Sequence, residues 1–131
     1  MLSRMNPLYA TTKQGTIAEL LVQLRLLEHD IQAAPPVKDS GNDLIAIRGK
    51  TFRAVQVRST TIEVIDKPKV DVLYDVLAVV QFPTNDGRIV TRDAEIYLFS
   101  KDEVEQISGK VSKYRDNLLN WSLLDKSFPK V

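Results

Sequence analysis

The sequence predicts an α/β domain in which a mixed central β-sheet is flanked by helices. Three observations lead to this fold class. A helix-forming segment occupies residues 11–29, two strand-like segments surround a Gly-Lys turn between residues 44 and 57, and a long apolar run with branched side chains occupies residues 72–82. Helix and strand segments that mix along a chain in this way are typical of a sheet that carries a helix on at least one face.

The composition is that of one ordinary globular domain. The chain has 131 residues, 44% hydrophobic and 27% charged, so we expect a single domain over residues 1–131. The absence of cysteine excludes disulfide frameworks, zinc–cysteine sites and thiol nucleophiles, and a single histidine excludes a site built from several histidines. The net charge is +1, and no apolar run suits a signal peptide or a membrane span. These features predict a cytoplasmic protein without a membrane partner.

The first helix is expected from about Thr11 to His29. Thr11 and Thr16 each stand three residues before a glutamine or glutamate, which is the spacing of a capping box. Apolar residues cover most of the helix circumference, so we expect burial on more than one side. Glu19 lies in the narrow polar stripe and has two interpretations, as the capping partner of Thr16 or as a site residue.

A β-hairpin is predicted around the two-residue turn formed by Gly49 and Lys50. Opposed residues of an antiparallel pair share one face of the sheet. The predicted pairs are Arg48 with Thr51, Ile47 with Phe52, Ile45 with Ala54, and Asp43 with Gln56. Arg58 continues the face of Asp43 and Gln56 two residues further along. The hairpin therefore predicts a carboxylate, an amide and a guanidinium at the end of an apolar layer.

Two interpretations of this polar cluster remain open. In the first, a strand pair emerges from the core and its polar ends are solvated. In the second, the cluster is a metal and phosphate site, because a hard divalent cation prefers carboxylate, amide and backbone oxygens. Asp43 would supply the anionic ligand, Gln56 a neutral oxygen and Val57 a backbone carbonyl, with Arg58 placed against the charge of a phosphate.

The second half of the chain is predicted to add three strands and two helices. The strands are expected at 72–82, 89–90 and 95–99, with a turn at 83–87. Ser100 and Glu103 have capping-box spacing and begin a short helix that ends near Gly109. A last helix is expected from about Ser112 to Leu124. Its apolar residues fall roughly on one face: Tyr114, Leu118, Trp121 and Leu124.

Three segments resemble the PD-(D/E)xK nuclease superfamily, which includes the restriction-endonuclease-like fold: Gly15–Leu20, Ser40–Ile45 and Val55–Ser59. They are similar to a helix bearing a glutamate, a Gly-x-Asp that enters a strand, and a Gln-x-Lys or Glu-x-Lys on the hairpin partner. The likeness covers roughly Lys13 to Thr60 and is greatest to small Holliday-junction resolvases and intron-encoded endonucleases. It implies a DNA endonuclease that hydrolyses phosphodiester bonds with Mg²⁺ or Mn²⁺.

The resemblance also implies roles for four residues. Asp43 matches the metal-binding aspartate, Gln56 the Glu or Gln position, and Arg58 the catalytic lysine, while Glu19 matches the helix glutamate that reaches a metal. The implied metal set is Asp43, Gln56, Glu19 and the carbonyl of Val57. Two departures bear on activity. Gln56 removes one anionic ligand, and arginine at position 58 stays protonated and cannot act as a general base. The alternative is a catalytically degenerate member that acts as a DNA-binding or oligomeric assembly module.

The expected partners are DNA and further copies of the chain. The segment from Leu44 to Ile62 carries four basic and no acidic residues, which suits a DNA backbone or a solvated hairpin. Small members of the resembling family work as dimers or tetramers, so we expect a homodimer or homotetramer, with the last helix as the interface. Asp39, just ahead of the Gly-x-Asp, is interpreted as a turn residue.

Overall fold

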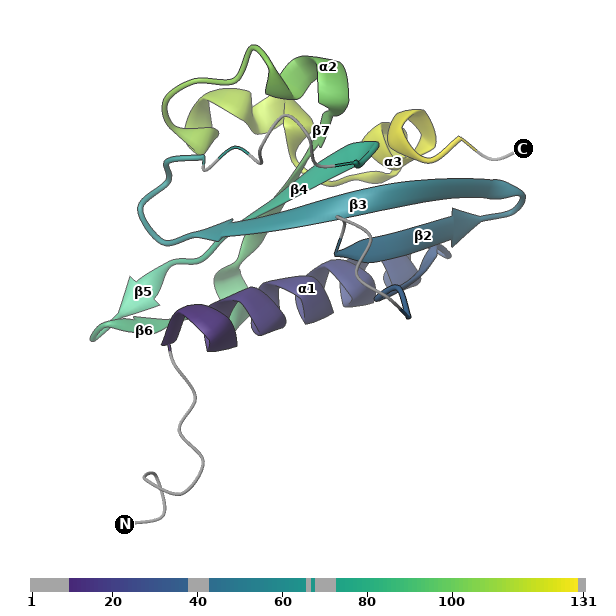
Figure 1. Ribbon diagram of the computed structural model, residues 1–131. Coiled ribbons are helices and arrows are strands. Elements are labelled where there is room, and N and C mark those ends of the chain that lie inside the picture. Colours follow the sequence, from purple (N-terminus) through teal and green to yellow (C-terminus); the bar gives the residue numbers. More distant parts are fainter. Residues whose placement is uncertain (1–9, 38–42, 66, 68–72, 130–131) are drawn as a thin grey trace.

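Five strands form the central mixed sheet of the computed structural model, which describes residues 10–37, 43–65, 67 and 73–129 (Figure 1). Their order across the sheet is β1-β2-β3-β4-β7. Only the β3–β4 pair is parallel, and the other neighbours are antiparallel. The bounds are Gln32–Ala34 for β1, Leu44–Arg48 for β2, Thr51–Thr60 for β3, Val76–Gln81 for β4 and Glu95–Ser100 for β7. The predicted fold class, a mixed sheet flanked by helices, is confirmed.

The β2–β3 hairpin has the register that the sequence predicts. Arg48 pairs with Thr51 across the turn, and the ladder continues through the Ile45–Ala54 pair to end at Leu44 opposite Val55. Gly49 has a φ of 61°, a conformation that glycine adopts without a Cβ penalty. β1 was expected only as a short apolar segment, because three residues are too few to show an alternating pattern.

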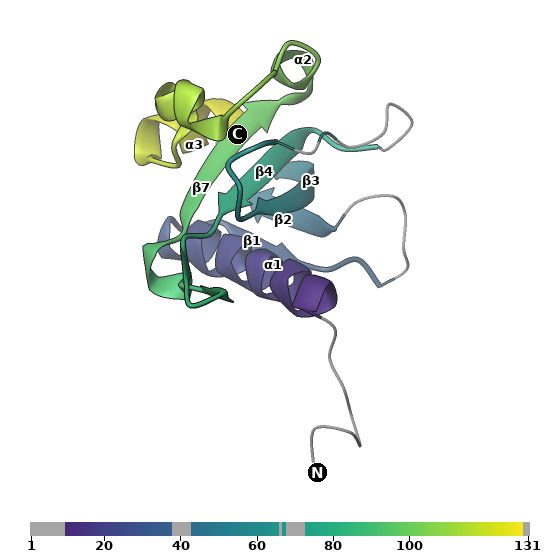
Figure 2. The ribbon, with the colours of Figure 1, turned by 90° about the vertical axis from the view of Figure 1, so that its left-hand side faces the viewer.

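Helix α1 (Ala10–Glu28) covers one face of the sheet (Figure 2). Its buried side consists of Ala18, Val22 and Leu26, all 0% exposed. The expectation of burial on more than one side is wrong, since no described layer covers the outer side. The leucines that remain about half exposed there are Leu20, Leu24 and Leu27. In the described part of the chain, no helix is long and apolar enough to cross a membrane.

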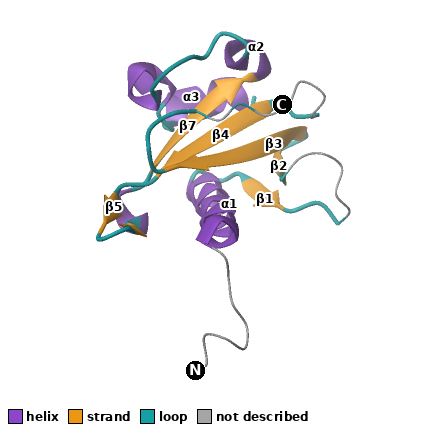
Figure 3. Cartoon of the chain, turned by 60° about the vertical axis from the view of Figure 1, so that its left-hand side comes forward, coloured by secondary structure: helices purple, strands orange, loops and turns teal. Residues whose placement is uncertain are grey.

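The opposite face of the sheet carries α2 (Lys101–Val104) and the 3-10 segment η3 (Val111–Asn117), as Figure 3 shows. The capping box of Ser100 and Glu103 is present at the start of α2. The single helix expected from Ser112 to Leu124 is wrong. The chain is extended at Leu118, and α3 (Trp121–Ser127) begins anew where the Asn120 side chain accepts a hydrogen bond from Leu123 N at 2.9 Å. The Asn120 cap therefore starts a new helix inside the segment that the apolar pattern predicted as one helix.

A separate two-stranded ribbon follows β4. It consists of β5 (Thr84–Asn85) and β6 (Arg88–Ile89) and is followed by the 3-10 turn η2 (Thr91–Asp93). The sequence predicted a turn over 83–87 and a strand at 89–90, but not their pairing. Two-residue strands are too short for a periodic signal, whereas the Asp86-Gly87 turn is a recognised hairpin signature.

Candidate functional site

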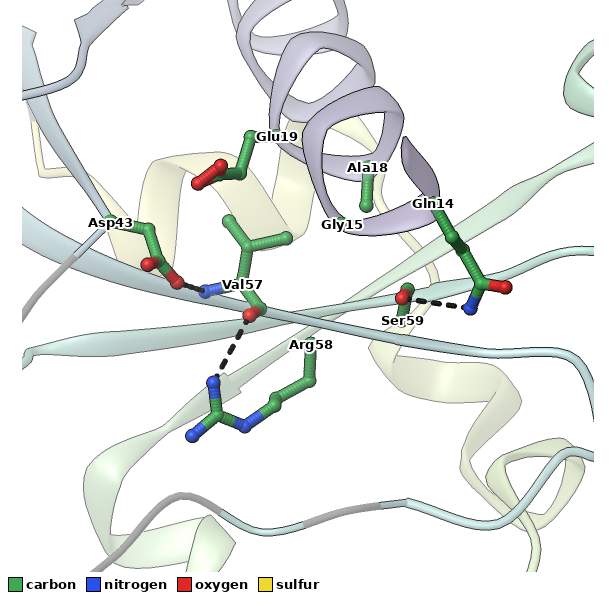
Figure 4. A pocket seen from close by; sticks show the side chains of 8 residues that line it. All are labelled: Gln14, Gly15, Ala18, Glu19, Asp43, Val57, Arg58 and Ser59. Atoms are coloured by element: carbon green, nitrogen blue, oxygen red, sulfur yellow. Dashed lines mark hydrogen bonds between the residues drawn. The ribbon is translucent and has the colours of Figure 1, made fainter. Parts of the chain in front are cut away.

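Asp43 is held against β3 by two hydrogen bonds. Its backbone N donates to Val55 O at 3.1 Å, and its carboxylate Oδ2 accepts from Val57 N at 2.8 Å (Figure 4). The expected backbone pairing of Asp43 with Gln56 therefore does not form. Instead, the Asp43 carboxylate accepts a hydrogen bond from the backbone N–H of Val57, the residue after Gln56. This contact fixes one carboxylate oxygen, and the other makes no hydrogen bond to a described residue.

Glu19 projects from α1 toward the same place. Its carboxylate and that of Asp43 lie on the same side of β3 (Figure 4). Burial raises the pKa of the Glu19 carboxyl above its ordinary value of 4.5, and the negative charge of Asp43 raises it further. Glu19 and Asp43 are thus electrostatic neighbours of like charge, although 24 residues separate them in the sequence.

The capping interpretation of Glu19 is wrong. α1 begins at Ala10, so Thr16 lies inside the helix and its hydroxyl donates to Thr12 O at 3.0 Å. Thr11 lies inside the helix as well. Glu19 is therefore free of a helix-end role, and within the described chain its carboxylate has no hydrogen-bond or ion-pair partner.

The two carboxylates line a pocket of about 370 Å³ between α1 and β3. Gln14 closes one side, where its Nε2 donates to Ser59 Oγ at 2.9 Å. Ala18 and Val57 supply the apolar floor. The complete lining is Gln14, Gly15, Ala18, Glu19, Asp43, Val57, Arg58 and Ser59.

Arg58 borders this pocket but extends away from the two acids. Figure 4 shows its guanidinium on the other side of the strand, where Nη1 makes a long contact of 3.5 Å with Val57 O. Burial raises the pKa of the Tyr74 hydroxyl, as does the charge of Glu105, while the charge of Arg58 opposes both. Arg58 thus acts on Tyr74, which belongs to the core on the α2 side of the sheet.

Gln56, in contrast to Arg58, does not line the pocket. It is 6% exposed, and in the described part of the chain its Oε1 has no hydrogen-bond partner, as is also true of Arg58 Nε. Strand alternation explains the placement, because Val57 packs into the core on the α1 side and its neighbours point the other way. Gln56 and Arg58 share a face, as predicted, but it is not the face of Glu19.

The chemistry of the donor set fits one hard cation. Mg²⁺ is commonly bound through one or two carboxylates together with waters and substrate phosphates. Glu19 and Asp43 supply two such carboxylates, side by side and without a neutralising cation among the described residues. Within those residues no group of three or more acidic or histidine side chains could hold a metal. Asp39 lies outside the described residues.

Sequence reasoning missed four pocket residues, Gln14, Gly15, Ala18 and Ser59, and one structural residue, Asp75. The capping-box interpretation places Gln14 at the start of the helix. The neighbouring Gly15 is four residues before Glu19 and therefore lies on the same face of the helix as Glu19. That spacing was the available signal for this part of the lining. Asp75 accepts a hydrogen bond from Ala54 N at 2.8 Å, and no motif marks it.

The predicted interface on the last helix is largely covered. Tyr114 and Leu118 pack against the core on the α2 side. Trp121 remains about half exposed, and its ring lies edge-on to His29 with centroids 4.5 Å apart. The homodimer or homotetramer stays a prediction.

The fold is similar to that of a solved bacterial homing endonuclease, I-Ssp6803I. The two chains share 19% sequence identity, with 90% of this chain and 95% of that protein covered and a TM-score of 0.52. The chain has an endonuclease-like fold. No protein-family model matches the sequence. No curated protein matches it either.

Proposed function

We propose that the chain is a Mg²⁺-dependent DNA endonuclease of the PD-(D/E)xK type. The observation that carries the proposal is the pair of carboxylates, Glu19 and Asp43, which line one pocket, where burial and then the charge of Asp43 raise the pKa of the Glu19 carboxyl. Two like charges are costly to hold together without a cation. The endonuclease-like fold supports the choice of DNA as substrate.

In this proposal, Asp43 and Glu19 hold the metal and β3 positions the phosphodiester. The hydrogen bond from Val57 N orients the Asp43 carboxylate, and Ala18 in the buried core anchors the helix that carries Glu19. Bound Mg²⁺ would make a coordinated water more acidic and offset charge on the phosphate. Mn²⁺, which prefers the same oxygen ligands, should substitute.

The Val57 carbonyl is the proposed neutral ligand and needs a local change to serve, whereas Gln56, which the resemblance also implies as a ligand, does not line the pocket. Val57 O accepts the long contact from Arg58, and Gln56 lies on the far side of the strand. Binding of DNA phosphate would draw the Arg58 guanidinium from Val57 O, because arginine forms bidentate contacts with phosphate. That movement would free the carbonyl.

The second candidate function is a DNA-binding module that no longer cuts. Arg58 favours it, since arginine remains protonated at the position where the resembling family has lysine and its guanidinium points away from the acids. Binding would then use the positive charge of Arg58 for a phosphate, and Glu19 and Asp43 would have no catalytic task.

The test is cleavage of supercoiled plasmid and of a four-way DNA junction in Mg²⁺ or Mn²⁺, with wild type and Asp43→Ala side by side. We expect metal-dependent cutting by wild type and a loss of more than about a hundredfold in the variant. Equal cutting by both proteins would overturn the proposal. DNA binding without cutting by wild type would establish the second candidate.

A further inference from the structure

The β5–β6 ribbon is an exposed, structured element of the described residues that the proposed function does not use. All four residues from Thr84 to Gly87 are exposed, as is Arg88. Asp86 and Gly87 have φ values of 52° and 75°, so the turn has positive φ at both central positions, as in a type I′ hairpin. The ribbon is therefore a defined, tight hairpin and not a loose loop.

The base of this ribbon is fixed to the core that carries α1. Phe82, just before it, is 0% exposed, and Val90 N donates to Pro83 O at 2.7 Å across its base. Ile89 packs against the same core as Ala18 of α1. The tip is thus presented to solvent at a set position relative to the carboxylate pocket.

Cross-strand pairing decides which side chains the ribbon presents. Thr84 pairs with Ile89, and Asn85 pairs with Arg88. Opposed residues share a face, so Ile89, which points to the core, leaves Asn85 and Arg88 together on the outer face. Neither side chain makes a hydrogen bond or ion pair with any described residue. An arginine and an asparagine are therefore held side by side, exposed and unengaged.

These two residue types have well-defined partners in duplex DNA. Arginine forms paired hydrogen bonds with guanine O6 and N7, and asparagine with adenine N6 and N7, both in the major groove. That groove is about 12 Å wide and admits a two-stranded β-ribbon. The ribbon lies at the same end of the molecule as the first turns of α1 (Figure 1), from which Gln14 and Glu19 line the pocket.

We propose that the β5–β6 ribbon enters the major groove of duplex DNA and reads base edges with Asn85 and Arg88. The inference rests on the proposed endonuclease function and adds the element that selects the sequence. Arg88 would recognise a guanine and Asn85 an adenine close to it, at a fixed offset from the phosphate held in the carboxylate pocket.

The experiment is selection from a random duplex DNA library in EDTA, where cleavage is suppressed, with the full chain as wild type, Asn85→Ala, Arg88→Ala and Arg92→Ala. Arg92 is the matched control, an exposed arginine in η2 that pairs with Asp93 at 3.5 Å. Enriched duplexes and their single-base variants are then titrated by fluorescence anisotropy. Melting temperatures verify that each variant is folded.

Wild type and Arg92→Ala are expected to enrich one sequence. Arg88→Ala should lose about tenfold to a hundredfold of the preference for guanine at one position, and Asn85→Ala a similar preference for adenine at another. If both ribbon variants keep the discrimination of Arg92→Ala, the ribbon does not read bases. The inference is then overturned while plasmid cleavage still supports the proposed function.

A wild type that binds duplex DNA but enriches no sequence also overturns the inference, again without touching the proposed endonuclease activity. A wild type that neither binds duplex DNA nor cuts plasmid overturns both. The ribbon variants should still cut a plasmid that carries the enriched sequence, with a weaker preference for that sequence, because neither residue lines the carboxylate pocket. Loss of that cleavage in a folded Arg88→Ala protein would count against a role limited to sequence reading.

Discussion

Asp43 and Asp75 precede the two strands that pair with β3, and they use their carboxylates in the same way. Each accepts a hydrogen bond from a β3 backbone N–H at 2.8 Å, Asp43 from Val57 and Asp75 from Ala54. Their surroundings differ. Asp43 lies beside Glu19, whereas Asp75 borders a groove that both basic and acidic residues line: Arg53, Lys101, Lys126, Asp102 and Glu103. One hydrogen bond explains why an aspartate stands at each position, but only the neighbouring charges distinguish a candidate site from a structural cap.

The largest expected effect comes from replacing each aspartate by asparagine. This change keeps an acceptor oxygen for the hydrogen bond to β3 and removes the negative charge. We expect Asp43→Asn to lose more than about a hundredfold in metal-dependent plasmid cleavage, and Asp75→Asn to stay within about threefold of wild type. Both should unfold in denaturant at similar concentrations, since both retain the bond to β3. Equal losses of cleavage in the two variants would show that the effect is structural.

Glu19→Gln tests the second half of the comparison, the charge beside Asp43. Because folding raises the pKa of the Glu19 carboxyl, the folded state binds its proton more tightly than the unfolded chain. The free energy of unfolding therefore falls as pH rises from the ordinary value of 4.5 through the raised pKa. Without metal, we expect Glu19→Gln to melt above wild type at pH 8 and to approach it near pH 4.5.

Added Mg²⁺ or Mn²⁺ should reverse that order at neutral pH. Metal at about a hundred times its Kd would stabilise wild type by about 2.7 kcal/mol, and the variant by less. Glu28→Gln is the matched control on the same helix, since Glu28 pairs with Arg25 at 2.7 Å and lies away from the pocket. Identical metal responses in wild type and Glu19→Gln, measured by thermal unfolding in EDTA and in metal, would remove Glu19 from the site.

The smallest expected effect comes from Arg58→Lys, which tests whether a side chain on the face of β3 away from the acids limits cleavage. Lysine can lose its proton and is shorter, so cleavage should rise, but by no more than about tenfold because the side chain starts on the face away from the acids. Arg53→Lys, another arginine of β3 outside the carboxylate pocket, is the control. Initial rates of plasmid nicking measure both. An unchanged rate in Arg58→Lys would argue that position 58 does not limit the chemistry.

Parts of the candidate site follow from local patterns. The hairpin register was predictable because a two-residue turn and alternating apolar residues leave one pairing, which placed Asp43 just before β2 and Gln56 with Arg58 on one face. The predicted register is wrong at Asp43 itself, which does not pair with Gln56. A side-chain hydrogen bond to Val57 N replaced the next backbone pair there, and a short polar side chain can always compete with a ladder in this way.

The sequence alone determined what depends on neighbours a few residues apart: the fold class, the hairpin around Gly49 and the capping box at Ser100. Only the tertiary structure decided that Glu19 meets Asp43, because their contact depends on how the buried face of α1 packs on β3. It also decided that Gln56 and Arg58 lie across the strand from both acids. Strand alternation fixes which residues share a face, but the packing of a helix decides which face becomes the site.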